Sequence, residues 1–586
     1  MTEAAAKETV RPAPARPAAG VLRRLPAAPL YFWLAALVIA PNILLFATSF
    51  LSSSGGVLVY EFSLANYARA LGSDTVRLLI LRTILTALAA ASLATLVAYP
   101  LAYYVSRHLG RYKLLAVMLV VIPLWVSLLI RAFAWRIILG ENGVLNSFLV
   151  NLGLLDAPSD AFLYTRFAVI LALTYMAIPY VFISAYTALE RVPNSLLEAS
   201  YDNGATPFRT LLHVVWPLSK QGVAIGFCLA FLLAVGDYLT PTMVGGLDGT
   251  MVGMVVASQF GLAGNWPYGS AMAIVLMMAV SLVLLAVTYF SRGRGILQDV
   301  DAGAGAPPRQ PDRSLGGLVK SLGAKVLLLL PYVYLYLPLL IIGVFSFNDS
   351  EIQAMPLGGF TMRWYVELIG DSGLIEAFQR TLLVAGITVG VALVAGVGFA
   401  MLFAYLRIRW AGAIQGLLAM PVAIPGIVLG ISMVIACQFV GIEPGIPRVV
   451  VGHSTFVMPV MMLIVLSRLK RLDPSYVQAS MDLGANYVQT FRYVLFPMIR
   501  SAVIGGGLLG FTLSVDEVIV SLFLTGIEPT LPVYVWNQMR FGFTPSVNAI
   551  FTAIGLVSLG LVLLAIFFMN RSAAGKNGTP EWLSVR

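Results

Sequence analysis

Long apolar stretches alternate with short polar loops along most of the chain. A bilayer core of about 30 Å is crossed by about 20 residues of α-helix, so stretches of that length predict transmembrane helices. Backbone groups find no water partner in lipid, and these stretches are too long and too uniformly apolar for the strands of a barrel. The pattern predicts an all-α integral membrane protein with about twelve transmembrane helices, at 30–52, 80–105, 114–136, 166–188, 219–243, 270–290, 325–347, 379–405, 411–437, 448–468, 499–525 and 547–569.

The pattern of the first six stretches recurs in the last six, with an offset that changes only once. The offset is 298 for Arg82 and Arg380, Thr83 and Thr381, and Pro123 and Pro421, and it is 280 for Pro179 and Pro459 and for Pro217 and Pro497. The chain therefore consists of two homologous six-helix halves. The first half carries 18 extra residues (298 − 280) between its third and fourth helices, near 137–165.

Polar segments divide the chain into five regions. Residues 1–29 are rich in Ala, Pro and Arg and predict a disordered tail, whereas 291–324 is rich in Gly, Pro and charge and predicts a linker. Between them lies the first half at 30–290, followed after the linker by the second half at 325–570 and a polar tail at 571–586. A signal peptide is the alternative at the N-terminus, but the first apolar stretch is too long for one, which favours a retained first helix.

Composition and charge agree with a membrane protein. Hydrophobic residues make up 59% of the chain and charged residues 11%, against about 25% charged in soluble domains. The net charge of +10 comes from Lys and Arg in short loops such as 106–113, which is the positive-inside pattern and not a nucleic-acid-binding face. It places these loops, the linker and both termini in the cytoplasm. The two cysteines and three histidines form no cluster that predicts a disulfide or a metal site.

The loops after the fourth and tenth helices, 190–220 and 470–500, align without a gap. Each predicts a short helix, a glycine at Gly204 or Gly484 that ends it, and a second helix that enters the membrane after a proline. Ser195 with Glu198, and Ser475 with Gln478, have the spacing of a capping box at the start of the short helix. The alternative interpretation is an amphipathic helix that only organises the loop at the interface.

This double loop resembles the EAA motif of ABC importer permeases, in which the first short helix docks in a cleft of the ATPase subunit. The matching positions are Glu198, Ala199, Ser200, Asp202, Gly204, Ala205, Phe208 and Pro217 in the first half, and Gln478, Ala479, Ser480, Asp482, Gly484, Ala485, Phe491 and Pro497 in the second. The chain departs from the family pattern by serine at the third position of both copies and by Gln478 in place of glutamate.

Further segments are similar to the permeases of spermidine/putrescine-type importers. Residues 131–146 and 236–246 look like the first permease subunit of that type, and 345–365 and 514–526 look like the second. The resemblance implies a fusion of the two subunits in a bacterial inner membrane, fed by an external binding protein and driven by two ATPase subunits. Polyamines are the first substrate it suggests, and ferric iron, phosphonates and amino-acid conjugates remain alternatives.

The chain has no Walker A motif, paired catalytic carboxylates or Ser/His/Asp set. We therefore expect no enzymatic activity and no cofactor in this chain, with ATP used by the partner subunits. Four ionisable residues lie within apolar stretches and are candidates for the substrate pathway: Asp237, Asp516, Glu517 and His453.

These residues have two interpretations. The three carboxylates could attract a cation near the outer end of the pathway, or they could bond backbone groups and pair with Arg131 or Arg136. His453 fits a hydrogen-bonding residue inside the bundle, with substrate contact as the alternative.

Two other transporter classes compete with the importer interpretation. A twelve-helix secondary transporter shares the six-plus-six architecture, but that class has no helix–glycine–helix loop after the fourth and tenth helices. A channel would need a repeated filter sequence, and none is visible.

Overall fold

The computed structural model describes residues 27–54, 57–261, 263–291, 315–406, 408–541, 545–557 and 560. Nearly all of both predicted tails, and most of the linker predicted at 291–324, lie outside these residues.

The first half is helical apart from one small hairpin. Its first span is α1 (Ala28–Trp33), η2 (Leu34–Ile39) and α2 (Ala40–Thr48), followed by β1 (Ser52–Ser54), β2 (Val57–Val59) and α3 (Ala65–Gly72). Then come α4 (Asp74–His108), η3 (Gly110–Tyr112), α5 (Lys113–Val121), η4 (Ile122–Trp125), α6 (Leu128–Leu139), α7 (Val144–Asn151) and α8 (Arg166–Glu190). The half ends with α9 (Asn194–Asp202), α10 (Pro207–Thr210), η5 (Leu211–Val215), α11 (Trp216–Gly236), α12 (Leu239–Val244), α13 (Val252–Phe260) and α14 (Trp266–Ser291).

The second half repeats this order. It contains α15 (Leu315–Phe345), α16 (Arg363–Gly370), α17 (Ser372–Tyr405), α18 (Ala411–Ala423), α19 (Gly426–Val440) and α20 (Ile446–Leu469). It continues with α21 (Ser475–Asp482), α22 (Tyr487–Thr490), η6 (Phe491–Leu495), α23 (Phe496–Val515), α24 (Ile519–Leu524) and α25 (Leu531–Phe541).

The helical, multi-span fold predicted from the sequence is confirmed. Among the described residues, nine helices are long and apolar enough to cross a membrane, and two bent helix pairs raise this to as many as 11. The twelfth predicted span, 547–569, is described only in part, as the apolar helix Ser546–Val557.

The third and ninth predicted spans, 114–136 and 411–437, are not single helices, which corrects the sequence prediction. The axis bends by 88° between α5 and α6, and by 99° between α18 and α19. In the first half Pro123 lies in a 3-10 turn before the break, and in the second Pro425 precedes α19 as its N-cap. Proline removes a backbone donor and clashes with the preceding turn, so both helices end near these residues. Arg131 therefore lies near the start of the short helix α6 and not at the outer end of a straight span.

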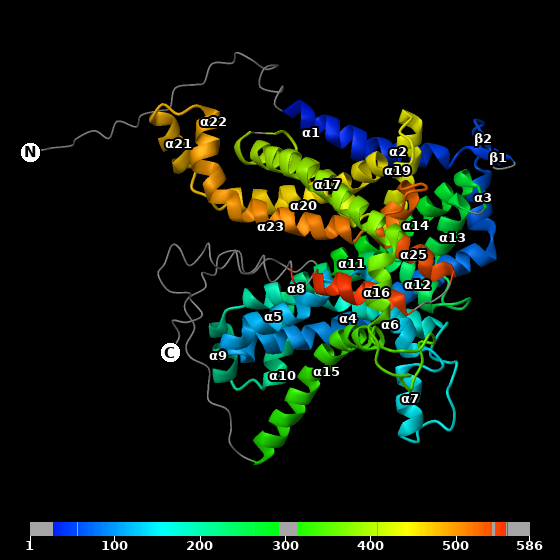
Figure 1. Ribbon diagram of the computed structural model, residues 1–586. Coiled ribbons are helices and arrows are strands. Elements are labelled where there is room, and N and C mark those ends of the chain that lie inside the picture. Colours follow the sequence, from blue (N-terminus) through cyan, green and yellow to red (C-terminus); the bar gives the residue numbers. More distant parts are fainter. Residues whose placement is uncertain are drawn as a thin grey trace, which may run out of the picture.

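The first helix of each half packs against the other half. Leu30, Leu34 and Val38 of the first span share a buried cluster with residues of α17 and α20, and Trp33 meets Phe399 edge to face with ring centroids 6.1 Å apart. Figure 1 shows α1 lying along the second half, whereas α15 leaves its own half and joins α4, α5 and α6. The two halves are therefore interlocked, although each is contiguous in sequence.

Hydrogen bonds between α15 and α8 hold α15 against the first half. The Tyr334 hydroxyl donates to the Leu171 carbonyl at 2.6 Å, and the Tyr175 hydroxyl donates to the Leu335 carbonyl at 3.1 Å. Both bonds lie inside an aromatic cluster with Trp135. Buried tyrosines that satisfy backbone carbonyls combine apolar packing with hydrogen bonding.

The threonines that revealed the repeat have the same structural role in both halves. The buried Thr83 hydroxyl accepts from the Val252 backbone N–H at 2.9 Å, and the buried Thr381 hydroxyl accepts from that of Leu531 at 2.7 Å. Each satisfies a backbone donor at the first turn of a helix, α13 or α25, which has no partner within its own helix. The extra segment near 137–165 contains α7, where the second half has only the short connection between α19 and α20.

Candidate functional site: paired elbows and the cavity between the halves

The loop 190–220 folds into an elbow of two helices, α9 and α10, joined at Gly204. Gly204 has φ +80°, a conformation that side-chain-bearing residues rarely adopt. Its N–H donates to the Tyr201 carbonyl at 2.9 Å, and the Ala205 N–H donates to the Ser200 carbonyl at 3.1 Å. These two bonds form a Schellman motif, which satisfies carbonyls at the end of a helix. The repeated Gly-Ala pair is therefore the C-terminal stop of α9.

The second elbow, α21 and α22, has the same geometry at the positions 280 residues later. Gly484 has φ +85°, its N–H donates to the Met481 carbonyl at 2.9 Å, and the Ala485 N–H donates to the Ser480 carbonyl at 3.1 Å. In both elbows the third residue of the motif ties the arms together. The Ser200 and Thr210 hydroxyl oxygens are 2.9 Å apart, and those of Ser480 and Thr490 are 3.1 Å apart.

The capping boxes predicted at the start of the short helices are wrong. The N-caps of α9 and α21 are Pro193 and Pro474, and neither side chain makes a capping hydrogen bond. Relative to a serine N-cap, α9 begins two residues earlier and α21 one residue earlier, so Glu198 and Gln478 lie beyond reach of the cap backbone. A capping box is present at the other arm of the second elbow, where Asn486 and Gln489 exchange side-chain and backbone hydrogen bonds at 2.9 Å.

The second arm of each elbow continues into the membrane helix that follows it. α10, η5 and α11 run on as one helix, Pro207–Gly236, and the equivalent helix in the second half is Tyr487–Val515. In the two halves a π-helical turn ends two residues before Pro217 and Pro497. A π-turn widens the helix locally, which accommodates a residue without an N–H donor.

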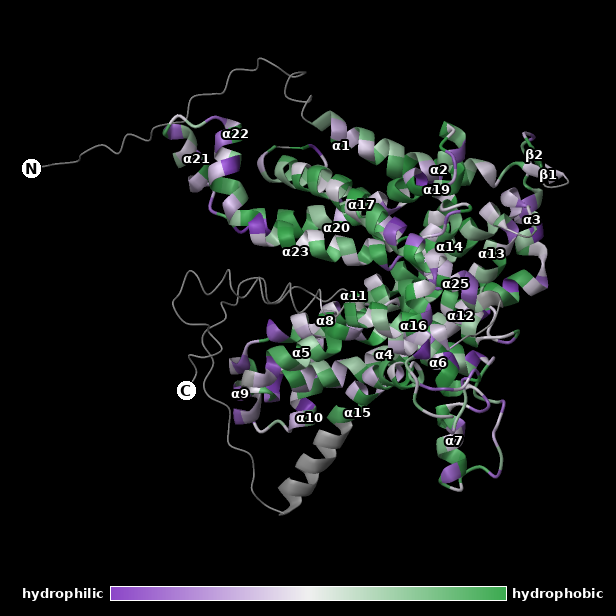
Figure 2. Cartoon of the chain, viewed as in Figure 1, coloured by the Kyte–Doolittle hydropathy of each residue, from purple (hydrophilic) through white to green (hydrophobic). Residues whose placement is uncertain are grey.

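Both elbows lie at the same end of the molecule and present exposed side chains. Glu198, Ala199, Asp202 and their equivalents Gln478, Ala479 and Asp482 are exposed. Large apolar groups are exposed beside them: Phe208, Leu483, Tyr487 and Val488. Figure 2 shows hydrophilic residues gathered at these ends, with hydrophobic residues along the helices behind them. An exposed surface that mixes apolar and polar groups in this way is typical of an interaction site.

The intramembrane carboxylates lie where the helices of the fifth and eleventh spans break. Asp237 follows the last residue of α11, and its carboxylate accepts hydrogen bonds from the backbone N–H and the hydroxyl of Thr240. Glu517 accepts from the Val520 N–H at 2.9 Å. These two equivalent residues therefore start the next short helices, α12 and α24, which agrees with the backbone-bonding interpretation.

Asp516 differs because its carboxylate contacts the first half. Its Oδ2 accepts from the Leu128 N–H at 3.3 Å, at the first residue of α6. It also lines a cavity of about 50 Å³ between the halves, with Ser127 and Leu129 on one side and Phe511, Pro532 and Phe551 on the other. Ligand sites for small molecules measure about 300–1,000 Å³, so this cavity is too small to hold such a solute.

Arg131 is buried in α6 within electrostatic range of Asp237 and Asp516, but among the described residues it forms no ion pair with either. The Arg136 guanidinium lies over the Tyr164 ring, 5.6 Å from its centroid. His453 is buried, and its ring nitrogens contact the hydroxyls of Ser514 and Ser521 at 2.8 and 2.9 Å. Both nitrogens are thus occupied inside the second half, as expected for a hydrogen-bonding residue of the bundle.

Sequence reasoning identified Ser200 and Ser480 but missed their partners Thr210 and Thr490, and it also missed Arg107. The two threonines could have been found from the sequence, since they too recur at the 280 offset. Arg107 left no such signal, because it lies in a basic loop that the positive-inside pattern already explains. No group of three or more metal-ligating residues is present in the described part of the chain.

Comparison with known proteins gives a family match in both halves. The family described as "Binding-protein-dependent transport system inner membrane component" matches residues 98–294 and 392–576. The spermidine/putrescine transport system permease protein PotB of Haemophilus influenzae is 33% identical over 267 residues, which are 45% of this chain and 91% of that protein. PotC of Escherichia coli is 33% identical over 248 residues, 42% of this chain and 94% of that protein.

Two whole permeases of this kind therefore fit in the length of one chain. A solved bacterial ABC transporter involved in alginate import aligns with 46% of the chain and 94% of its own, at 16% identity and a TM-score of 0.36. None of these findings favours a secondary transporter.

Proposed function

This chain belongs to the family of inner membrane components of binding-protein-dependent transport systems and is a permease of an ABC importer. We propose that its two halves together form the complete translocation pathway, with one docking site for an ATPase subunit on each half. The observation that carries the proposal is the pair of elbows, which share one backbone geometry and lie at one end of the molecule (Figure 1).

The elbows suit two copies of one ATPase. Each presents a short helix with an exposed acidic or amide residue, closed by the same Schellman motif and tied by the same hydroxyl pair. Such rigid, repeated shapes fit two copies of the same cleft. In this proposal ATP binds only to the partner subunits, and the elbow end, both termini and the linker face the cytoplasm.

The opposite end of the molecule would receive the substrate from an external binding protein. It carries the segments that project beyond the helical layers, among them α3, the β1–β2 hairpin and α7 (Figure 1). The family description names a binding-protein-dependent system, which supports this partner.

The substrate we propose is a small organic polycation such as spermidine or putrescine. The names of the PotB and PotC relatives support it. Of the candidate pathway residues, Asp516 lines the cavity between the halves, whereas Asp237 and Glu517 are not among its lining residues. A buried carboxylate facing a pathway favours a cationic solute over an anionic one.

Reconstitution tests the proposal. The full chain is purified with its ATPase and placed in lipid vesicles with the binding protein, and uptake of labelled spermidine is measured with and without ATP. We expect uptake that needs all three components. Uptake driven by an ion gradient without ATP would instead identify a secondary transporter, and ATP-dependent uptake of an anionic solute in preference to spermidine would refute the substrate.

A further inference from the structure

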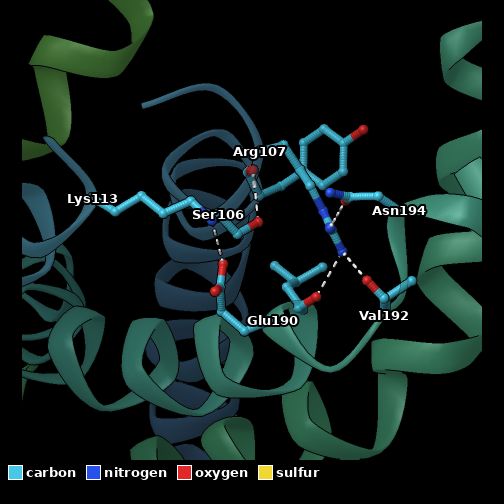
Figure 3. Close-up of polar contacts among 8 residues, drawn as sticks. Ser106, Arg107, Lys113, Glu190, Val192 and Asn194 are labelled. Atoms are coloured by element: carbon cyan, nitrogen blue, oxygen red, sulfur yellow. Dashed lines mark hydrogen bonds and ion pairs between the residues drawn. The ribbon is translucent and has the colours of Figure 1, made fainter. Parts of the chain in front are cut away.

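One guanidinium holds the start of the first elbow. Arg107, at the end of α4, donates from Nη1 to the Asn194 side-chain oxygen at 2.5 Å and from Nη2 to the carbonyls of Leu189 and Val192 at 2.7 and 2.9 Å. Figure 3 shows its side chain reaching from α4 to the turn between α8 and α9. This one side chain of α4 is thus bonded to three other segments: the end of α8, the turn that follows it and the first residue of α9.

The chemistry of this contact suits a rigid link. The Leu189 carbonyl lies in the last turn of α8, where helix carbonyls lack partners and carry partial negative charge. A guanidinium offers planar, fixed donors, so three hydrogen bonds set its orientation as well as its position. Hydrogen bonds from a charged donor are about twice as strong as neutral ones.

Two more polar contacts join helices next to the first elbow. Lys113, at the start of α5, forms an ion pair with Glu190 at 3.0 Å. Further along α4 the Tyr99 hydroxyl lies 3.0 Å from that of Ser219, and the Tyr99 ring packs against Trp216. α4 is therefore bonded to both sides of the elbow, near the start of α9 and near the start of α11.

The second half lacks this arrangement at the equivalent positions. Arg107 corresponds to Tyr405, Asn194 to Pro474, Lys113 to Ala411 and Glu190 to Lys470. Among the described residues, no hydrogen bond or ion pair joins α17 to α21. The start of α21 is instead held locally, since the Ser475 N–H donates to Asp473 at 2.9 Å and lowers the pKa of that carboxyl.

We propose that Arg107 is a positioning residue that fixes coupling helix α9 to membrane helix α4, so that the two elbows transmit ATPase movement unequally. The first elbow moves α4 directly through the guanidinium, whereas the described residues give the second elbow no hydrogen bond or ion pair to α17. This proposal rests on the ATPase-docking function proposed above.

The first test uses the full chain alone in lipid nanodiscs. Arg107→Met removes the donors at similar length, and Tyr405→Met is the matched change in the second half. Hydrogen–deuterium exchange of residues 195–203 should become about tenfold faster in the Arg107 variant. Exchange of residues 475–483 should be unchanged by Tyr405→Met. Unchanged exchange at α9 in the Arg107 variant would overturn the proposal.

The second test measures coupling, which a merely structural role would not change. In vesicles with the ATPase and binding protein, we expect Arg107→Met to copurify with the ATPase and hydrolyse ATP, but to move several-fold less spermidine per ATP. Arg107→Lys keeps the charge without the planar donors and should restore only part of this ratio. An unchanged ratio in Arg107→Met, or an equal loss in Tyr405→Met, contradicts unequal transmission.

Failure of the docking function itself has a different signature. In the unmodified chain, added ATPase would then leave the exchange of both α9 and α21 unprotected. Failure of the Arg107 link appears only in the variant, with normal protection of both helices in the unmodified chain.

Discussion

The hydroxyl oxygen of Ser200 lies 2.9 Å from that of Thr210, and this contact joins the two arms of the first elbow. Thr210 is fully buried, so its hydroxyl has no access to water. The same pair recurs as Ser480 and Thr490. The serine that departs from the Glu-Ala-Ala pattern is therefore matched by a threonine ten residues later in each half, and it supplies the hydrogen bond that an alanine could not.

Removing one hydroxyl of this pair should loosen the elbow. Ser200→Ala leaves the buried Thr210 hydroxyl unsatisfied, which costs about 1–3 kcal/mol locally. The double change Ser200→Ala with Thr210→Val removes both polar groups and should be milder than the single change. Limited proteolysis of residues 190–215 measures this. A double variant that is cleaved faster than the single one would contradict the account.

The left-handed glycines should tolerate asparagine better than valine. A Cβ at Gly204 or Gly484 meets no atom within 4 Å, so the effect of a substitution is backbone strain alone. Gly204→Val should cost about 1–2 kcal/mol and reduce transport while membrane insertion persists, whereas Asn is tolerated in this conformation. Spermidine uptake and the amount of inserted protein are the measurements. Equal uptake in the Val and Asn variants would exclude backbone strain at the glycine that ends the helix as the cause.

Glu198 should contribute to ATPase contact and not to loop stability. It is exposed and, among the described residues, has no hydrogen-bond partner. Glu198→Gln and Glu198→Ala should therefore melt like the unmodified chain, which replaces the expectation of a capping role. Binding of the ATPase should fall slightly in both, by the ~0.2–1 kcal/mol of an exposed ion pair. A lower melting temperature in Glu198→Ala alone would restore the capping explanation.

Asp516 should matter through its charge. Asp516→Asn keeps an oxygen that can accept from the Leu128 N–H but removes the negative charge beside the cavity. We expect assembly to persist and spermidine uptake to fall about tenfold, a change of ~1.4 kcal/mol. Glu517→Gln is the matched control. The glutamine oxygen can still accept from the Val520 N–H at the start of α24. Equal losses in both variants would remove the special role of Asp516.

The two halves should assemble without a covalent tie. Fragments 1–300 and 315–586 expressed together should copurify, because α1 packs on the second half and α15 on the first. Deleting residues 1–48 from the first fragment removes α1 and α2 and should weaken this association. Copurification through a tag on one fragment measures both. No association of the complete fragments would contradict the interlocked arrangement.

The sequence alone determined the membrane class, the helical fold, the two homologous halves and the positions of both elbows. These follow from local quantities: the length of apolar stretches, fixed offsets between repeated residues, and glycines whose backbone freedom is needed where they stand. Even so, local patterns misplaced the capping boxes, since a shift of two residues in the start of α9 puts Glu198 out of reach of the cap backbone.

Only the tertiary structure decided what lies between elements distant in sequence. The crossing of α1 and α15 into opposite halves, the Asp516 contact with Leu128 and the Arg107 link to α9 join residues 82 to 388 positions apart. Such pairs are selected by packing and by the need of buried polar groups for hydrogen-bond partners. Neither produces a periodic pattern in the sequence. The repeat predicted equal halves, whereas the described residues show the contacts of Arg107 in the first half and none like them between α17 and α21 in the second.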